Sequence, residues 1–94
     1  MYVVVKFEDD YAAFEGLSPV IYIKDIADSV GSYLHNSQTM DEVGKGLYRY
    51  DFNDIVKSKD YYVYIDGGSS VDLNERYKEQ IITFDIGRQL EEKY

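Results

Sequence analysis

The chain has no cysteine and no tryptophan, only one proline and one histidine, and few basic residues. Without cysteine it can form no disulfide and offers neither a thiolate metal ligand nor a thiol nucleophile. Ten Lys and Arg stand against eighteen Asp and Glu, which gives a formal net charge of -8. Because the chain lacks a basic stripe that would displace counterions, we expect no direct nucleic-acid partner and no anionic membrane partner.

Long apolar runs are also missing. No segment approaches the ~20 apolar residues of a membrane span, and the start MYVVVKFEDD lacks the basic region and apolar stretch of a signal peptide. The 94 residues fit a single domain, 1–94, without repeats or linkers. The acidic balance leaves two readings open, namely a well-solvated surface or mimicry of DNA that blocks a DNA-binding protein.

Tyrosine is what the chain has in quantity, with eleven copies beside four phenylalanines. A tyrosine ring can pack while its hydroxyl stays wet, which suits a strand with one covered face or an interface. Two tyrosine-rich runs, Leu47–Phe52 and Tyr61–Ile65, lie between glycines and predict a pair of adjacent β-strands. In the first run we expect Tyr48, Tyr50 and Phe52 to share the inward face.

Alternating and β-branched residues predict further short strands along the chain. They are Tyr2–Phe7, Val20–Lys24 after the single proline, Val30–His35, a weaker Thr39–Val43 beyond a turn at Asn36-Ser37, and a last strand near Gln80–Asp85. The pattern predicts a mainly β protein, an Ig-like antiparallel β-sandwich of about seven short strands.

The last third of the chain allows two patterns. From Asp72 onward the apolar spacing also fits an amphipathic helix, with Asp72 as N-cap and Glu75 as its capping-box partner. We favour a short polar turn and a strand, followed by a short C-terminal helical segment over Ile86–Lys93.

Groups that could perform catalysis are few. His35 stands in a polar stretch without a nucleophile motif, and we expect it at the surface. The acidic residues Asp9-Asp10, Asp51, Asp54 and Asp66 lack the spacing of a calcium loop, and Asp66-Gly67-Gly68 predicts a turn and not a phosphate loop. We therefore predict no catalytic residue, no metal ligand and no cofactor, and a protein that is not an enzyme.

The tyrosine rows have two explanations that stay open at this point. They can form the core and its cross-strand pairs, or they can be exposed anchors for another protein or for sugar rings. The candidate protein-interface residues are Tyr2, Val4, Tyr61, Tyr62 and Tyr64. As an edge strand, Tyr2–Phe7 could also pair with a strand of a neighbouring subunit.

Four stretches resemble a small module of tailed-bacteriophage structural proteins. The family pattern has a "GLTP-x-I-x-I" strand, an "M-x-E-V-G-x-G-x-Y-x-Y-x-F" strand and a "Y-x-V-x-x-D-G-G" strand. Here the corresponding stretches are G-L-S-P-V-I-Y-I (Gly16–Ile23), M-D-E-V-G-K-G-L-Y-R-Y-D-F (Met40–Phe52) and D-Y-Y-V-Y-I-D-G-G (Asp60–Gly68), followed by E-R-Y (Glu75–Tyr77). The segment Ile81–Tyr94 departs from the pattern.

The resemblance implies a β-sandwich in the virion, made in the host bacterial cytoplasm. The role it implies is an accessory or decoration capsid subunit that contacts other virion proteins, either the major capsid protein or tail and neck proteins, as a homo-oligomer or in many copies. The alternatives are a tail- or fibre-associated module that binds host-surface glycan, and an acidic DNA-mimic inhibitor.

Overall fold

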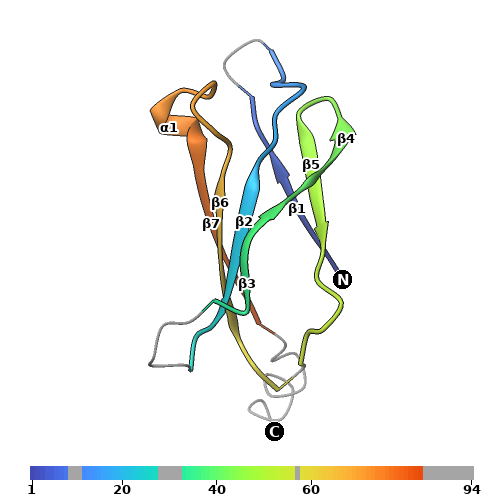
Figure 1. Ribbon diagram of the computed structural model, residues 1–94, viewed down its shortest axis with the longest axis vertical. Helices are drawn as coiled ribbons and strands as arrows, with labels where there is room; N and C mark the ends of the chain where they lie inside the picture. Colours follow the sequence, from blue (N-terminus) through green and yellow to red (C-terminus); the bar gives the residue numbers. More distant parts are fainter. Residues whose placement is uncertain (9–11, 28–32, 57, 84–94) are drawn as a thin grey trace, which may run out of the picture.

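The protein is mainly β, as expected, with two antiparallel sheets packed face to face (Figure 1). The computed structural model describes residues 1–8, 12–27, 33–56 and 58–83. The finer, Ig-like assignment of the sandwich stays a prediction. The expected helical segment Ile86–Lys93 lies outside the described residues.

Each sheet combines strands that are far apart in the sequence. The three-stranded sheet has the order β1-β5-β4 and contains β1 (Tyr2–Lys6), β5 (Leu47–Asp51) and β4 (Asp41–Gly44). The four-stranded sheet has the order β3-β2-β6-β7 and contains β3 (His35–Thr39), β2 (Val20–Asp25), β6 (Tyr61–Asp66) and β7 (Tyr77–Ile82). A one-turn helix, α1 (Leu73–Arg76), precedes β7.

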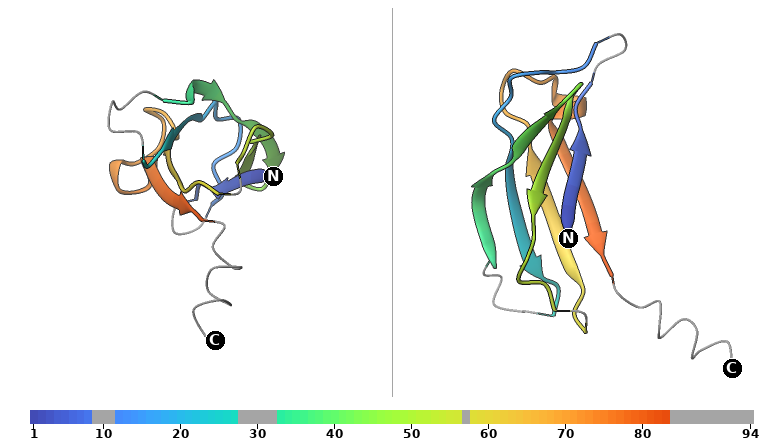
Figure 2. Two further views of the ribbon diagram at one scale, coloured as in Figure 1. Left: turned by 90° about the horizontal axis from the view of Figure 1, so that it is seen from below. Right: turned by 90° about the vertical axis from the view of Figure 1, so that its right-hand side faces the viewer.

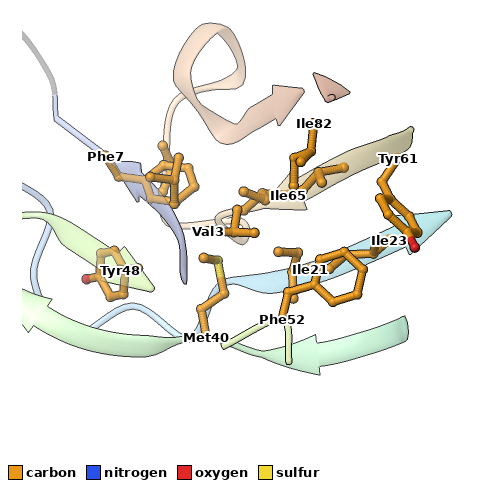
Figure 3. Packing of buried hydrophobic residues seen from close by; sticks show 13 residues of the cluster. Val3, Phe7, Ile21, Ile23, Met40, Tyr48, Phe52, Tyr61, Ile65 and Ile82 are labelled. Atoms are coloured by element: carbon orange, nitrogen blue, oxygen red, sulfur yellow. The ribbon is translucent and has the colours of Figure 1, made fainter. Parts of the chain in front are cut away.

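The core lies between the sheets and follows from the period-two alternation of the strands (Figure 3). On β6, for example, Tyr61, Val63 and Ile65 are buried while Tyr62 and Tyr64 face outward. The buried cluster comprises Val3, Val5, Phe7, Ile21, Ile23, Met40, Tyr48, Phe52, Tyr61, Val63, Ile65, Val71 and Ile82. The predicted inward aromatic row is confirmed: Tyr48 and Phe52 are fully buried, and Tyr50 packs against the cluster.

The two tyrosine-rich runs form β5 and β6 as predicted, but they do not pair with each other. They belong to different sheets, so the prediction that they are adjacent strands is wrong. The connection after β5 crosses from one sheet to the other, and Phe52 and Ile55 from it pack into the core. Local pattern identifies such strands but carries no information about which sheet each one joins.

The third and fourth predicted strands need correction. Thr39, expected to begin the fourth strand, ends β3, and the fourth strand, β4, is Asp41–Gly44. Asn36 and Ser37 lie inside β3 and not in a turn, while Tyr33 and Leu34 precede that strand; residues 30–32 lie outside the described residues. As an end strand with mostly exposed side chains, β3 has no apolar alternation to reveal it. Its pairing with β2 shifts register, and Ser37 there takes a left-handed conformation with φ of 57°.

The last strand, β7, begins three residues earlier than the predicted Gln80–Asp85 and ends at Ile82. The helix before it is a single turn; Asp72 occupies the N-cap position, but its side chain makes no capping hydrogen bond. Lys78 and Gln80 point inward on β7 with Ile82, so polar residues occupy inward positions and hide the alternation. Phe84 and Asp85 lie outside the described residues.

Glycines shape two of the predicted turns. The corner between β4 and β5 places Gly44, Lys45 and Gly46 at positive φ, which glycine adopts without steric cost. After β6, Gly67 lies against the Phe7 ring, where an added Cβ would come within 2.6 Å of a ring carbon. This close approach explains why a glycine without positive φ is needed at that position.

The sandwich is closed on one side and open on the other. On the closed side the chain runs from β3 into β4 through the buried Met40, so one extended segment passes between the sheets (Figure 1). On the open side the two end strands, β1 and β7, run in opposite directions next to each other (Figure 2).

Candidate functional site

Five tyrosines gather on the outer face of the four-stranded sheet, and we call this surface the tyrosine face. It comprises Tyr22 from β2, Tyr62 and Tyr64 from β6, Tyr77 from β7, and Tyr33 just before β3. The pleat directs alternate residues outward, and register places Tyr22 directly opposite Tyr64. The strand pairing therefore gathers rings that are up to fifty-five positions apart in the sequence (Tyr22 to Tyr77).

Four of these rings form a continuous row across the sheet. Ring centroids are 5.4 Å apart between Tyr33 and Tyr22, 5.7 Å between Tyr22 and Tyr64, and 5.8 Å between Tyr64 and Tyr77. The last two rings are stacked, with an interplanar angle of 17°. These distances are those at which aromatic pairs attract beyond simple burial, so the row is held in place before any partner arrives.

The guanidinium group of Arg76 ends the row at β7. Its Cζ lies 4.9 Å from the centroid of the Tyr77 ring, and its Nε and Nη2 donate to the two carboxylate oxygens of Asp66 at 2.8 Å and 3.3 Å. The bond from Arg76, helped by the N–H of Gly68, holds the pKa of the Asp66 carboxyl below its ordinary value. Both charges of this pair are thereby satisfied within the protein.

Tyr62 is the fifth tyrosine of the tyrosine face and lies outside the row of four rings. Its hydroxyl donates to Glu79 Oε1 at 2.8 Å, and burial, reinforced by this bond to Glu79, raises the pKa of Tyr62 to about 12. Beside it lies an open depression of about 300 Å³ lined by Lys24, Ile26 and Tyr62. The phenol is therefore a neutral hydrogen-bond donor at physiological pH.

Charge on the tyrosine face differs from charge on the chain as a whole. Lys24 and Arg76 balance Asp66 and Glu79 there, although the formal net charge of the chain is -8. An aromatic, locally balanced surface on an acidic protein has the composition of an interface core, where charged residues are depleted and tyrosine is enriched.

The candidate interface residues separate into three groups in the structure. Tyr62 and Tyr64 lie on the tyrosine face. Tyr2 and Val4 lie on the outer face of the other sheet, where the Arg49 guanidinium covers the Tyr2 ring at 4.8 Å. Tyr61 is 1% exposed, and its hydroxyl accepts a bond from the N–H of Val56, so it belongs to the core and is not a surface residue.

Tyr22, Tyr33 and Tyr77 are not among the interface residues expected from the sequence. Alternation with buried residues places Tyr22, Tyr62 and Tyr64 on the outer side of their strands. Whether these rings meet depends on the strand order β2-β6-β7. Pairing between strands that are distant in the sequence sets that order, and no short sequence pattern predicts it.

A second cluster surrounds the single histidine. His35 Nδ1 lies 2.6 Å from the Tyr50 hydroxyl, and His35 Nε2 lies 2.8 Å from Asp54 Oδ1. The imidazole also packs edge-on against Phe52 with centroids 5.2 Å apart, and its side chain is only 16% exposed. His35 is therefore only partly exposed, because Tyr50 on β5 and Phe52 just after that strand pack against its ring.

The order of donors in this cluster follows from its chemistry. Burial, and then the nearby charges of Asp54 and Asp51, raise the pKa of Tyr50, so the phenol keeps its proton. When the Tyr50 hydroxyl donates to Nδ1, the hydrogen on Nε2 is the one that donates to Asp54. A phenol in this state is a poor nucleophile, and the arrangement acts as a brace that joins β3, β5 and the loop after β5.

In the part of the chain that the structure describes, no group of three or more His, Asp or Glu side chains is placed to hold a metal ion. Likewise, none of the helices there has the length and apolar character needed to cross a membrane.

Comparisons of the chain with protein-family models, with curated proteins and with solved structures found no match.

Proposed function

We propose that the chain is a non-enzymatic structural subunit of a tailed-bacteriophage virion, an accessory or decoration protein that docks on other virion proteins. The observation that carries the docking is the row of tyrosine rings on the outer face of the four-stranded sheet. The virion assignment is supported by the motif resemblance of Gly16–Ile23, Met40–Phe52 and Asp60–Gly68. The site of action is then the virion, after synthesis in the host cytoplasm.

The tyrosine face suits protein docking because its rings are already packed against one another. A tyrosine has two side-chain torsions, and a ring held by two neighbours has little rotamer freedom left to lose on binding. Tyr22 and Tyr64 are such rings, since each is flanked on both sides by another tyrosine. A partner that covers them gains apolar burial at low entropic cost.

The same packing favours a protein over a glycan. Sugar rings stack on free aromatic faces, whereas Tyr64 and Tyr77 already stack on each other and the Arg76 guanidinium lies over the Tyr77 ring. Ring edges and hydroxyl groups remain for a partner, and these match hydrogen-bonding groups on a protein surface.

Many copies on one particle are consistent with the charge distribution. The locally balanced tyrosine face turns toward the particle, and the excess of acidic residues elsewhere keeps the decorated surface hydrated and the neighbouring copies from aggregating.

Mass spectrometry of purified particles of the encoding bacteriophage tests this function. We expect the chain to copurify with capsids at a fixed, repeated ratio to the major capsid protein. Its absence from the particles contradicts the virion assignment, and its presence only in separated tails supports the tail-associated alternative. Specific capture of a nuclease from host lysate, with no chain on particles, supports the DNA-mimic alternative.

A further inference from the structure

The open side of the sandwich is a seam between two unpaired strand edges. β1 ends the three-stranded sheet, β7 ends the four-stranded sheet, and the two run in opposite directions (Figure 2). Within the described residues, no backbone hydrogen bond joins β1 to β7. Side chains of β7 reach across: Gln80 Nε2 donates to the Val4 carbonyl at 3.3 Å, and Lys78 Nζ lies 5.5 Å from the centroid of the Phe7 ring.

The hydrogen-bond pattern shows which groups of β1 face the seam. The N–H of Phe7 donates to the Gly46 carbonyl, and the N–H of Phe52 donates to the Met1 carbonyl, both on the β5 side. Residues of an antiparallel strand alternate in the edge to which they direct their backbone groups. Tyr2, Val4 and Lys6 therefore direct their N–H and C=O groups into the seam.

The same reasoning applies to β7. The N–H of Gly67 donates to the Arg76 carbonyl, and the same register pairs Val63 with Gln80. The backbone groups of the even-numbered residues of β7 are therefore directed toward β6. Tyr77, Glu79 and Ile81 then direct their backbone groups into the seam from the opposite side. Each edge offers three residues in regular extended conformation.

Side chains, and not backbone groups, span the seam. In a paired ladder the strands lie about 4.8 Å apart and bond through their backbones, whereas here the contact with the Val4 carbonyl comes from the side chain of Gln80. Val3 on β1 and Ile82 on β7 are buried, whereas the outward side chains of Val4 and Ile81 on the same two strands are 49% and 65% exposed. A strand placed there would find hydrogen-bonding groups on both sides and apolar surface around it.

The polar residues that face inward on β7 protect this edge in the isolated chain. Lys78 pairs with Glu75 at 2.7 Å, and Gln80 occupies a carbonyl that would otherwise be free. Inward-pointing polar side chains on an end strand are a known means of preventing unspecific strand pairing. Both are flexible side chains that can move aside when a better partner for the edge arrives.

We propose that the seam between β1 and β7 is a strand-acceptor site that binds an extended segment of a partner polypeptide. Because β1 and β7 run in opposite directions, the added strand is antiparallel to one and parallel to the other. Its outward residues are β-branched or aromatic, to cover Val4 and Ile81, and it carries no net negative charge because the acceptor has a formal charge of -8. This site is independent of the docking proposed for the tyrosine face.

Hydrogen exchange of the chain alone, followed by NMR, tests whether the seam is open. The amides of Val4, Lys6, Glu79 and Ile81 should exchange at least about tenfold faster than those of Val3, Val5, Gln80 and Ile82, which face paired strands. Equal protection of the two sets would mean that β1 and β7 are already paired, and it overturns the proposal.

A blocked synthetic peptide of alternating valine and threonine with a lysine at each end is the probe for strand addition. We expect it to slow exchange of the seam amides selectively, and we expect the matched peptide with glutamates at the ends to bind at least about tenfold more weakly. Failure of the lysine peptide to protect the seam amides of the folded chain overturns the proposal. Protection of the tyrosine face in place of the seam does so as well.

Two variants test whether the peptide binds to the backbone edges of β1 and β7. Val4→Pro removes a seam N–H without removing a bond to β5, and it should weaken peptide binding at least about tenfold. Gln80→Leu removes the side chain bond that spans the seam but keeps every backbone group, so it should bind the peptide at least as well as the wild type. Loss of binding in a folded Gln80→Leu variant, with Val4→Pro unaffected, contradicts the assignment.

Discussion

The hydroxyl group of Tyr48 joins the segment before β2 to the three-stranded sheet. It accepts a bond from the N–H of Leu17 at 3.1 Å and donates to the carbonyl of Phe14 at 2.8 Å, while its ring lies in the core against Phe7. Both backbone groups belong to a connection with little regular structure, so a single side chain supplies their partners.

Tyr48→Phe should therefore lower the free energy of unfolding by about 1–3 kcal/mol, because it leaves a backbone donor and an acceptor without a partner in a partly buried place. Urea denaturation of the two proteins measures the difference. Tyr2→Phe is the matched control, since its ring is 55% exposed, and it should change stability by less than ~0.5 kcal/mol. Equal stability of Tyr48→Phe and the wild type would show that the hydroxyl is dispensable.

Tyr62 makes stability depend on pH in the alkaline range. Burial and the Glu79 bond raise its pKa from 10.0 to about 12 in the folded state, so the unfolded chain releases this proton first. The contribution of Tyr62 is fully present below pH 10 and is lost as the pH rises toward 12.

The measurement compares unfolding of the wild type and Tyr62→Phe from neutral pH to pH 12. The advantage of the wild type should shrink across pH 10–12, and the difference between the two proteins isolates Tyr62 from Tyr48, Tyr50 and Tyr64, whose pKa values are also raised. If the free energies of unfolding of the two proteins change in parallel with pH, Tyr62 is not the cause of the alkaline loss of stability.

Among the elements, the strands with regular apolar alternation follow from the sequence, and β3 and β7, which lack it, do not. The ends of β1, β2, β5 and β6 lie within one residue of the predicted strands, because alternating Val, Ile and Tyr residues on them fill one shared core. β3 and β7 lie at sheet ends, where exposed residues or inward Lys78 and Gln80 replace that alternation.

The candidate site was predictable only in part for the same physical reason. Tyr62 and Tyr64 stand out locally, since they alternate with buried residues on one strand. Their contact with Tyr22 and Tyr77 depends on strand order, and the contacts of His35 with Tyr50 and Asp54 span fifteen and nineteen positions. Such contacts arise from the tertiary arrangement and leave no short motif.

The brace around His35 connects the two sheets, and its energy can be measured by a double-mutant cycle. His35→Phe keeps the ring but loses both hydrogen bonds, and it should destabilise the protein by about 1–3 kcal/mol. Combined with Tyr50→Phe, the loss should be less than additive by at least ~0.5 kcal/mol, since both changes remove the same bond. Asp54→Asn, which keeps an acceptor oxygen, is the mild control. Additive effects of His35→Phe and Tyr50→Phe would mean that the two side chains do not act together.

For the whole molecule, the two outer faces offer different surfaces. The tyrosine face presents a pre-packed aromatic row with balanced charge, and the opposite face presents Tyr2 under Arg49 beside Val4. One flat partner surface cannot cover both, so docking through the tyrosine face leaves Tyr2 and Val4 free for the strand-acceptor seam or for solvent. The acidic residues elsewhere favour hydration of the remaining surface.

Under the proposed virion role, the copy number of the chain per purified bacteriophage particle tests the central claim most directly. Quantitative mass spectrometry measures it for three versions of the particle. These carry the wild type, the variant Tyr22→Ser/Tyr64→Ser, and the control Tyr2→Ser/Val43→Ser, whose side chains are exposed outside the tyrosine face, each verified as folded by circular dichroism. Docking through the tyrosine face predicts equal copy numbers for the wild type and the control and at least about a tenfold loss for Tyr22→Ser/Tyr64→Ser, as expected for central aromatic anchors. Equal copy numbers for all three versions, or a loss confined to the control, would contradict it.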